Sequence, residues 1–289
     1  MISNNQDHIS ENFDEGSVAI KRSDKDLDGM FDYSASDVET EGRIEVVNSG
    51  DLDKAIGLYK STLSKGLFSV QHGKIGIDMV LDPNEIDMFL KATLAYKDES
   101  NYSRNTGVVL SDLMQNSYDA ENSEFNFDFT QYPQLDFIAN YLTANSERKC
   151  KVNVIGDVGE YFGFYAQNSI FTLRGNSELK ILESCINSSA YVKGDVGSGF
   201  THANNSQVVI DGNIGKNFGT YSHKLSVVAT GKVKSYFGAS SVNFSAYCHD
   251  LKAKSSIGAR RSIVYVGDEA KENQTYKKMM QEFHEVMGE

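Results

Sequence analysis

The sequence predicts an α+β N-terminal domain followed by a right-handed parallel β-helix, or solenoid, and a C-terminal helix. Three observations carry this prediction: glycines recur about every nineteen residues after residue 150, apolar residues between 51 and 142 have helical spacing, and the C-terminus is amphipathic. The expected domains are an acidic arm at 1–47, an α+β domain at 48–147, the β-helix at 148–267 and the C-terminal helix at 268–289.

The arm at 1–47 differs in composition from the rest of the chain. It is polar and acidic, and its apolar residues are too scattered to form a helical stripe or a strand face. This composition indicates a disordered or loosely attached arm. Apolar residues such as Val18, Ile20 and Phe31 leave docking on the body or on a partner as the alternative to a solvated tail.

Helical signals dominate residues 48–147. Residues 82–85, DPNE, combine an N-cap, a proline at the first helical position and an acid at the third, which predicts a helix that runs to about Tyr96. Apolar spacing predicts three further helices. One is expected to begin near Asp51, and the others to cover 107–118 and 133–142.

Two stretches of the same region predict strands. Residues 73–81, GKIGIDMVL, are short and apolar. In residues 123–132, SEFNFDFTQY, phenylalanines alternate with polar residues at the period of two that is typical of a half-buried strand. The polar stretch TANSERKCK marks the expected boundary with the β-helix.

Glycine defines the repeat. Gly156, Gly175, Gly194, Gly212 and Gly231 follow one another at intervals of 19, 19, 18 and 19 residues. A unit of this length is one turn of a parallel solenoid, whose corners need residues that tolerate a left-handed or tightly bent backbone. The structural repeat glycines that we predict are Gly156, Gly159, Gly163, Gly175, Gly194, Gly197, Gly212, Gly215, Gly219, Gly231 and Gly238.

A polar residue follows four of the repeat glycines. Asp157, Asn176, Asp195 and Asn213 hold this position in successive turns. We expect them to stack as a corner ladder that satisfies neighbouring backbone groups. Stacked carboxylates and amides also bind calcium in some solenoids. Because two of the four are amides and Lys232 comes next, we prefer the structural role and predict no metal site.

The C-terminal segment predicts one amphipathic helix. Tyr276, Met279, Met280, Phe283 and Val286 fall on one helical face. We expect this helix to cap the open end of the solenoid, because an exposed last turn would be an aggregating edge. Docking of the helix on a partner is the alternative.

The repeats resemble the GXGXG-type β-helix that forms the C-terminal domain of the large chain of glutamate synthase and that also occurs in formylmethanofuran dehydrogenase. The segments GDVGEYFGFYAQNS and GNIGKNFGTYSHKLSVVATG share the order glycine, acid or amide, glycine, bulky residue, glycine. The resemblance covers the β-helix and implies a structural role beside domains that carry the chemistry. The N-terminal part, through PQLDFIANYL, is similar to archaeal proteins that join such a segment to GXGXG-like turns.

We assign no catalytic residue, no cofactor and no metal ligand from the sequence. His202, His223 and His249 fall at different positions of their turns, so they would not form one cluster. The chain also has neither a nucleophilic cysteine after Met1 nor a cysteine run for an iron–sulfur cluster, as glutamate synthase chemistry would need. A non-enzymatic role is therefore expected before an enzymatic one.

Charge and cysteine content bear on partners and location. A formal net charge of −12 argues against nucleic acid, because phosphate binding relies on clustered Lys and Arg. Three widely spaced cysteines, Cys150, Cys185 and Cys248, indicate reduced thiols. No signal-like segment or membrane-spanning apolar run is found. We expect a cytoplasmic protein with no membrane partner.

Three classes of function stay open. The leading prediction is a non-enzymatic structural scaffold or protein-interaction module that binds protein partners or forms a homo-oligomer. The first alternative is an accessory subunit of a glutamate-synthase-like or formylmethanofuran-dehydrogenase-like enzyme complex. The second is a small-ligand or carbohydrate binder that uses aromatic residues near one corner, unless these pack beneath the N-terminal domain. The aromatic residues concerned are Tyr161, Phe162, Phe200, Phe218, Tyr236 and Phe237.

Overall fold

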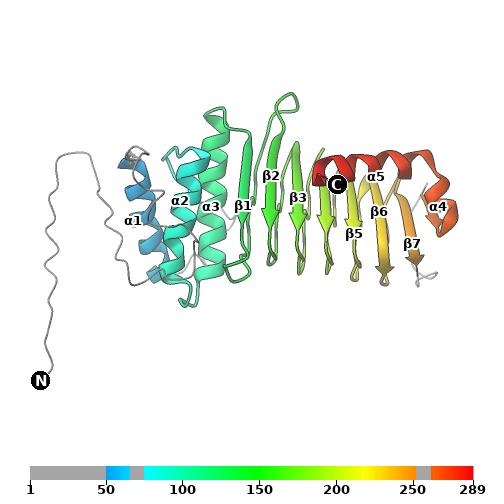
Figure 1. Ribbon diagram of the computed structural model, residues 1–289, viewed down its shortest axis with the longest axis horizontal. Coiled ribbons are helices and arrows are strands. Elements are labelled where there is room, and N and C mark those ends of the chain that lie inside the picture. Colours follow the sequence, from blue (N-terminus) through cyan, green and yellow to red (C-terminus); the bar gives the residue numbers. More distant parts are fainter. Residues whose placement is uncertain (1–49, 66–74, 252–261, 289) are drawn as a thin grey trace, which may run out of the picture.

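The computed structural model describes residues 50–65, 75–251 and 262–288. Three helices stand at one end of a long parallel solenoid, and the last helix folds back along it (Figure 1). The predicted order of N-terminal helices, parallel β-solenoid and C-terminal helix is thus confirmed. The arm predicted at 1–47 lies outside the described residues.

The helices before the sheet follow the capping signals of the sequence. They are α1 (Gly50–Lys65), α2 (Pro83–Thr93), the 3-10 helix η2 (Leu94–Tyr96) and α3 (Tyr102–Asp119). At the start of α2, the Asp82 carboxylate accepts the N–H groups of Asn84 and Glu85, both at 2.8 Å, and Glu85 accepts the Asp82 N–H at 3.0 Å. The predicted helix start is confirmed, whereas α3 begins at Tyr102, before the predicted 107.

The helix α3 packs directly against the first turn of the solenoid. Gly107 permits this approach, because a Cβ atom there would stand 1.7 Å from the carbonyl oxygen of Asp136. Ser111 donates from its hydroxyl to the Phe137 carbonyl at 2.7 Å. One apolar core runs from α1, α2 and α3 into the solenoid interior, so these helices cover the apolar end of the first turn.

Across the described residues the sheet has eight strands in chain order, each parallel to the next. They are β1 (Glu124–Asp128), β2 (Cys150–Ile155), β3 (Ser169–Arg174), β4 (Ser189–Lys193), β5 (Asn204–Asp211), β6 (His223–Val233), β7 (Ser245–Leu251) and β8 (Ile263–Val266). The strand predicted within 123–132 is confirmed as β1. It is the first strand of the solenoid sheet, because Phe127 pairs with Val154 of β2.

Inward-facing side chains stack in apolar columns from turn to turn. In a strand with one buried face, every second residue points into the interior, so each strand contributes alternate residues to these columns. One buried column consists of Val152, Phe171, Ala190, Val208, Val227 and Ala246. The column beside it consists of Val154, Leu173, Val192, Ile210, Ala229 and Cys248.

Residues 75–82 do not form a strand, so the prediction of a strand at 73–81 is wrong for its described part. Side chains of α3 take the place of a neighbouring strand. Asp112 accepts the N–H groups of Ile75 and Gly76 at 2.6 and 2.9 Å, and Asn116 donates to two carbonyls of the segment at 2.7 and 2.9 Å. The segment is apolar because it is buried under helices, and strand pairing is not involved.

The helix predicted at 133–142 is also wrong, because these residues form a corner of the first turn. Phe137, Ala139 and Tyr141 have φ angles of 61°, 54° and 56°. The N–H groups of Phe137 and Tyr141 donate to carbonyls of the next turn at 2.8 and 2.7 Å. The buried residues Leu135, Ile138 and Leu142 lie next to these left-handed residues, and their spacing of three and four positions imitates that of a helix.

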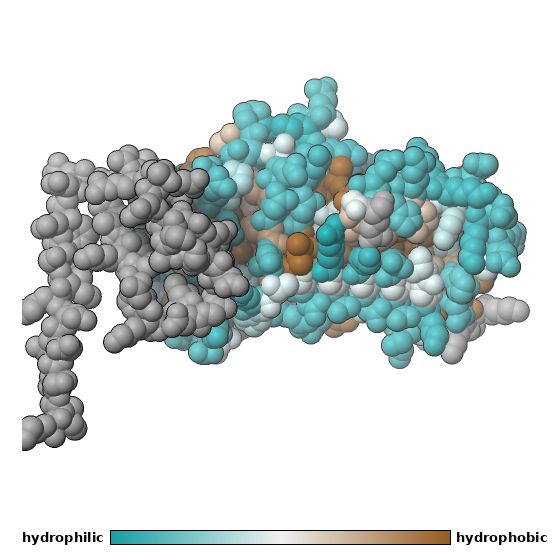
Figure 2. All heavy atoms as spheres, viewed as in Figure 1, coloured by the Kyte–Doolittle hydropathy of each residue, from teal (hydrophilic) through white to brown (hydrophobic). Residues whose placement is uncertain are grey.

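The C-terminal helices are α4 (Asp268–Glu272) and α5 (Gln274–Met287). The prediction that this segment caps the open end is wrong, since α5 turns back and crosses the outer face of β4, β5 and β6 (Figure 1). The reason is that the outer face is apolar at these strands. The side chains buried at this contact are Tyr191, Val209, Val228, Tyr247, Met279, Phe283 and Met287. The side of α5 seen in Figure 2 is mainly hydrophilic.

Candidate functional site

A polar groove of about 600 Å³, which we call the corner groove, runs along the solenoid where the strands begin. Its lining comes from the loop before β2 and from five successive turns. Every lining side chain ends in a hydroxyl, an amide or an ammonium group. The groove is therefore a surface of hydrogen-bond donors and acceptors.

One wall of the groove is a column of corner residues, which we call the wall column. Each member lies two residues before a residue of the in-register series Lys151, Ile170, Ser189, Gln207, Ser226 and Ser245. The wall column consists of Lys149, Asn168, Asn187, Asn205, Lys224 and Asn243. From Asn168 on, its φ angles lie between 49° and 55°. Asparagine tolerates this left-handed conformation better than other non-glycine residues, which explains its recurrence.

Three asparagines of the wall column, Asn168, Asn187 and Asn205, form a ladder of amides. Asn205 donates from Nδ2 to Oδ1 of Asn187 at 2.7 Å, and Asn187 donates in the same way to Asn168 at 3.2 Å. Asn168 donates to the Ala144 carbonyl at 2.8 Å. A primary amide carries two N–H groups. Each asparagine therefore has a second N–H to offer to a ligand, and the ladder holds that group in place.

The floor of the groove is formed by outward-facing residues of β4, β5 and β6. Ser189, Gln207 and Ser226 pair in register and are buried or half-buried. Gln207 Nε2 lies 3.3 Å from both the Tyr191 hydroxyl and Glu282 Oε2 of α5. Burial, reinforced by the Glu282 carboxylate, raises the pKa of Tyr191 to about 12, so its hydroxyl keeps its proton at neutral pH.

Two lysines give the groove a positive charge. Lys149 and Lys224 are exposed, and within the described residues neither forms an ion pair. Among the described residues, no carboxylate lines the groove. The two lysines stand four turns apart in the wall column, which at the usual strand spacing is roughly 19 Å. The groove is thus locally cationic on a chain of formal net charge −12.

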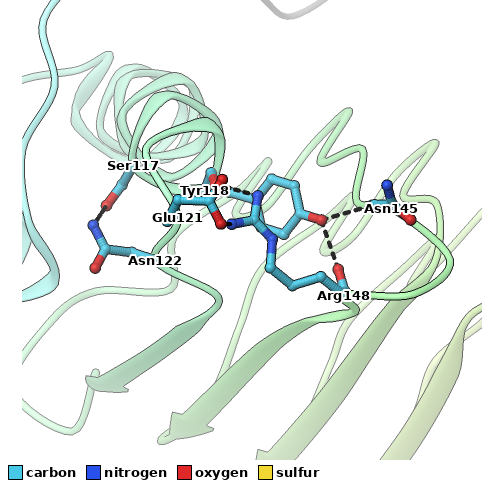
Figure 3. A network of polar contacts seen from close by, with 6 residues as sticks. All are labelled: Ser117, Tyr118, Glu121, Asn122, Asn145 and Arg148. Atoms are coloured by element: carbon cyan, nitrogen blue, oxygen red, sulfur yellow. Dashed lines mark hydrogen bonds and ion pairs between the residues drawn. The ribbon is translucent and has the colours of Figure 1, made fainter.

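The loop that carries Lys149 is tied to α3 (Figure 3). The Tyr118 hydroxyl donates to the Arg148 carbonyl and accepts the Asn145 N–H, both at 2.6 Å. The Arg148 guanidinium lies 4.3 Å from the centre of the Tyr118 ring, donates to the Tyr118 carbonyl at 2.9 Å and pairs with Glu121. The helical end of the molecule therefore fixes one end of the groove.

The residues of the predicted corner ladder lie at a different corner and are used structurally. The N–H of Asn176 donates to Asp157 Oδ1 at 2.7 Å, that of Asp195 to Asn176 Oδ1 at 2.8 Å, and that of Asn213 to Asp195 Oδ1 at 2.7 Å. Lys232 continues the series with an N–H bond to Asn213 Oδ1 at 2.9 Å. Each of these side-chain oxygens thus binds the backbone of the next turn.

The aromatic residues predicted as an exposed binding surface are mostly interior. Four of them are at most 1% exposed and lie in the solenoid core, namely Phe162, Phe200, Phe218 and Phe237. For these four, both predictions are wrong: they neither form a surface for a ligand nor pack beneath the N-terminal domain. Of the remaining two, Tyr161 is half-buried and Tyr236 is 55% exposed. The sequence does contain a signal for the wall column, since Asn or Lys recurs at its positions at intervals of 18 or 19 residues. Aligning the repeat on its glycines did not reveal this second series.

A second cleft, of about 500 Å³, lies between the start of α2, the outer face of β1, β2 and β3, and the end of α5. Its lining is mixed and includes Asp87, Phe127 and Val286. Arg174 points into it, and its guanidinium donates to the Met287 carbonyl. This cleft therefore belongs to the attachment of α5.

Other chemistry is sparse in the described part of the chain. No group of three or more His, Cys, Asp or Glu residues there is placed to hold a metal ion. No described helix is long and apolar enough to cross a membrane. The thiols of Cys150, Cys185 and Cys248 are buried, and burial raises the pKa of each to about 12. Comparison with protein-family models, curated proteins and solved structures gives no match for this chain.

Proposed function

We propose that the protein is a non-enzymatic scaffold and interaction module, built on a GXGXG-type solenoid, which presents the corner groove to a partner. The observation that carries the proposal is the lining of the groove. Nucleophilic and acid–base catalysis need a nucleophile or a titratable acid or base within hydrogen-bond reach of the substrate. The described lining offers amides, serine hydroxyls and two exposed ammonium groups, and it contains no histidine, cysteine or carboxylate that could activate a serine as a nucleophile.

The rigidity of the groove supports a binding role. Backbone hydrogen bonds join every turn to the next, and the amide ladder holds Asn168, Asn187 and Asn205 before any ligand arrives. A ligand that meets fixed side chains loses less free energy to ordering them. We also propose that the protein is cytoplasmic, and its three unpaired thiols are compatible with that location. The proposal includes the likeness to archaeal proteins with GXGXG-like turns.

Two alternatives accompany the leading proposal. The corner groove, in place of the buried aromatic residues, supports a binder of carbohydrate or of another hydrophilic ligand. An accessory subunit of a glutamate-synthase-like or formylmethanofuran-dehydrogenase-like complex would use the solenoid as a support. Co-purification with catalytic subunits separates this last role from the others.

The test is a native pull-down of the full chain from its source, with the mass of the eluate measured by light scattering. Ser226→Tyr fills the floor of the groove, and Ser235→Tyr is the matched control, since Ser235 is also half-buried but lies outside the groove. A partner retained by the control and lost by Ser226→Tyr supports an interaction module. Recovery of the wild-type chain as a monomer without any partner argues against it.

A further inference from the structure

We infer that the corner groove binds an acidic polysaccharide, a linear chain of carboxylate-bearing sugars that lies parallel to the solenoid axis. This inference rests on the groove being a binding site, as proposed above, and adds the chemical class of its ligand. Three independent features favour that class: the charge of the lining, its hydrogen-bonding groups and its period.

The charge of the groove selects an anion. Within the described residues, Lys149 and Lys224 have no ion-pair partner and no carboxylate lines the groove. Acidic residues outnumber basic ones by 40 to 28 in the whole chain, so a groove with two lysines and no acid departs from the average surface. An ammonium group binds a carboxylate as a point charge.

The neutral groups of the groove match a ligand rich in hydroxyls. The free amide N–H groups of the wall column and the hydroxyls of Ser189 and Ser226 provide donors and acceptors side by side. In the part of the chain that the structure describes, no aromatic ring lines the groove, so a ligand gains nothing from stacking on those residues. Recognition must come from polar contacts, which a sugar chain offers on both of its edges.

The period of the groove separates a sugar chain from an acidic peptide. Equivalent side chains recur about every 4.8 Å along the axis, whereas an extended peptide advances by about 3.3 Å per residue. The side chains on one face of such a peptide are about 6.6 Å apart, so they would meet equivalent positions of the wall column only about every fourth turn. A 1,4-linked pyranose advances by close to one turn of the solenoid, so successive sugars meet equivalent amides, and carboxylates four sugars apart reach Lys149 and Lys224.

The first experiment compares two ligands by isothermal titration calorimetry with the full chain. One is a galacturonate oligomer of about six sugars, long enough to span the wall column. The other is its methyl ester, which keeps the length and the ring hydroxyls but removes the charges. The acid form is expected to bind about 3- to 10-fold more tightly than the ester at low salt, because each exposed ion pair contributes modestly. Added salt should reduce this difference.

The two possible failures of this comparison differ. Equal binding of acid and ester would overturn the acidic class while leaving the groove a binding site for a hydrophilic polymer. Binding of neither form would overturn the polysaccharide inference, while the pull-down with Ser226→Tyr would still decide whether the groove binds a protein partner.

Variants locate the binding in the groove. The double variant Lys149→Gln/Lys224→Gln should weaken binding of the acid form about 3- to 10-fold. The double variant Lys216→Gln/Lys234→Gln removes the same charge from exposed lysines outside the groove and should leave binding within about twofold. Equal weakening in both would mean that overall charge is responsible and would overturn the site.

A further variant adds a charge and removes none. Ser226→Glu places a carboxylate on the floor of the groove and should abolish binding of the acid form, with circular dichroism showing that the solenoid is intact. Unchanged binding in folded Ser226→Glu would contradict the proposed position of the ligand.

Discussion

The carbonyl oxygen of Gly194 lies 2.1 Å from the position that a Cβ atom would take on Gly212, its equivalent one turn later. The same relationship joins Gly156 to Gly175 and Gly175 to Gly194, each at 2.2 Å. Consecutive turns thus approach each other at this corner so closely that no side chain fits between them. The period of glycine in the sequence is the consequence of this contact.

Replacing Gly212 with alanine should destabilise the protein. The new methyl group would overlap a backbone oxygen that the hydrogen bonds of the adjoining turns hold in place, so the turns must separate locally. We expect a loss of about 1–3 kcal/mol in the free energy of unfolding, the usual cost of overpacking. Urea denaturation followed by circular dichroism measures it.

Gly57→Ala is the matched control. Gly57 is exposed on α1, and a Cβ atom there meets no atom of the described residues within 4 Å. Alanine is the better helix former by about 1 kcal/mol, so this variant should be as stable as the parent or more so. Equal destabilisation by both substitutions would contradict the steric account of the repeat.

The corner ladder should respond to loss of its acceptors. Asp195→Ala removes the oxygen that binds the Asn213 N–H at 2.7 Å, and we expect a loss of about 0.5–1.5 kcal/mol because water can replace an exposed acceptor. Asp195→Asn keeps an equivalent oxygen and should lose less. Hydrogen exchange at the Asn213 amide should accelerate in the alanine variant. If that exchange rate is unchanged, the ladder does not protect the backbone.

The solenoid was predictable because the close contact between its turns can be made only by one type of residue. A corner without room for a Cβ atom accepts only glycine, so Gly175, Gly194 and Gly212 reveal the turn length directly. The start of α2 was predictable for a similar reason, since Asp82 and Glu85 satisfy the same free N–H groups in any helix.

Other features of the fold do not require a particular residue type, so a single sequence does not reveal them. Leu182 and Phe200 adopt φ angles of 47° and 50° at the corner where other turns have Gly163, Gly219 or Gly238. Stacking between turns imposes this conformation on residues that do not prefer it. For the same reason the helix-like spacing of residues 133–142 was misleading. The course of α5 depends on the outer face of distant strands, which periodicity within α5 does not encode.

The attachment of α5 can be tested at its most buried aromatic residue. Phe283 is 1% exposed and packs on the outer face of the sheet. Phe283→Ala should cost about 3–5 kcal/mol at that contact, which exceeds what a helix of this length retains by itself. We therefore expect α5 to leave the sheet and to become sensitive to limited proteolysis.

The control for this prediction lies two residues further along α5. Glu285 is exposed and accepts a hydrogen bond from Gln281 of the same helix at 2.8 Å. Glu285→Ala should keep the parent's resistance to proteolysis. If Phe283→Ala is as resistant as the parent, the helix is held by contacts other than its apolar face.

The three buried thiols predict a loss of stability in alkali. Burial raises the pKa of Cys150, Cys185 and Cys248 to about 12, from an ordinary value of 9.0. The folded chain therefore holds these protons to higher pH than the unfolded chain does. Their contribution is fully present below pH 9 and is lost as the pH rises from about 9 to 12, with a loss on the order of 1 kcal/mol per thiol by pH 10.

Urea midpoints at pH 8 and pH 10 measure this loss. Cys248→Val removes one thiol and keeps an apolar side chain of similar size, so the difference in unfolding free energy between the two pH values should shrink by an amount on the order of 1 kcal/mol. At pH 8 a thiol reagent should label none of the three cysteines in the folded chain and all of them in urea. Rapid labelling of the folded chain, or a Cys248→Val variant with the parent's full alkaline loss, would show that these thiols are not sealed in the interior.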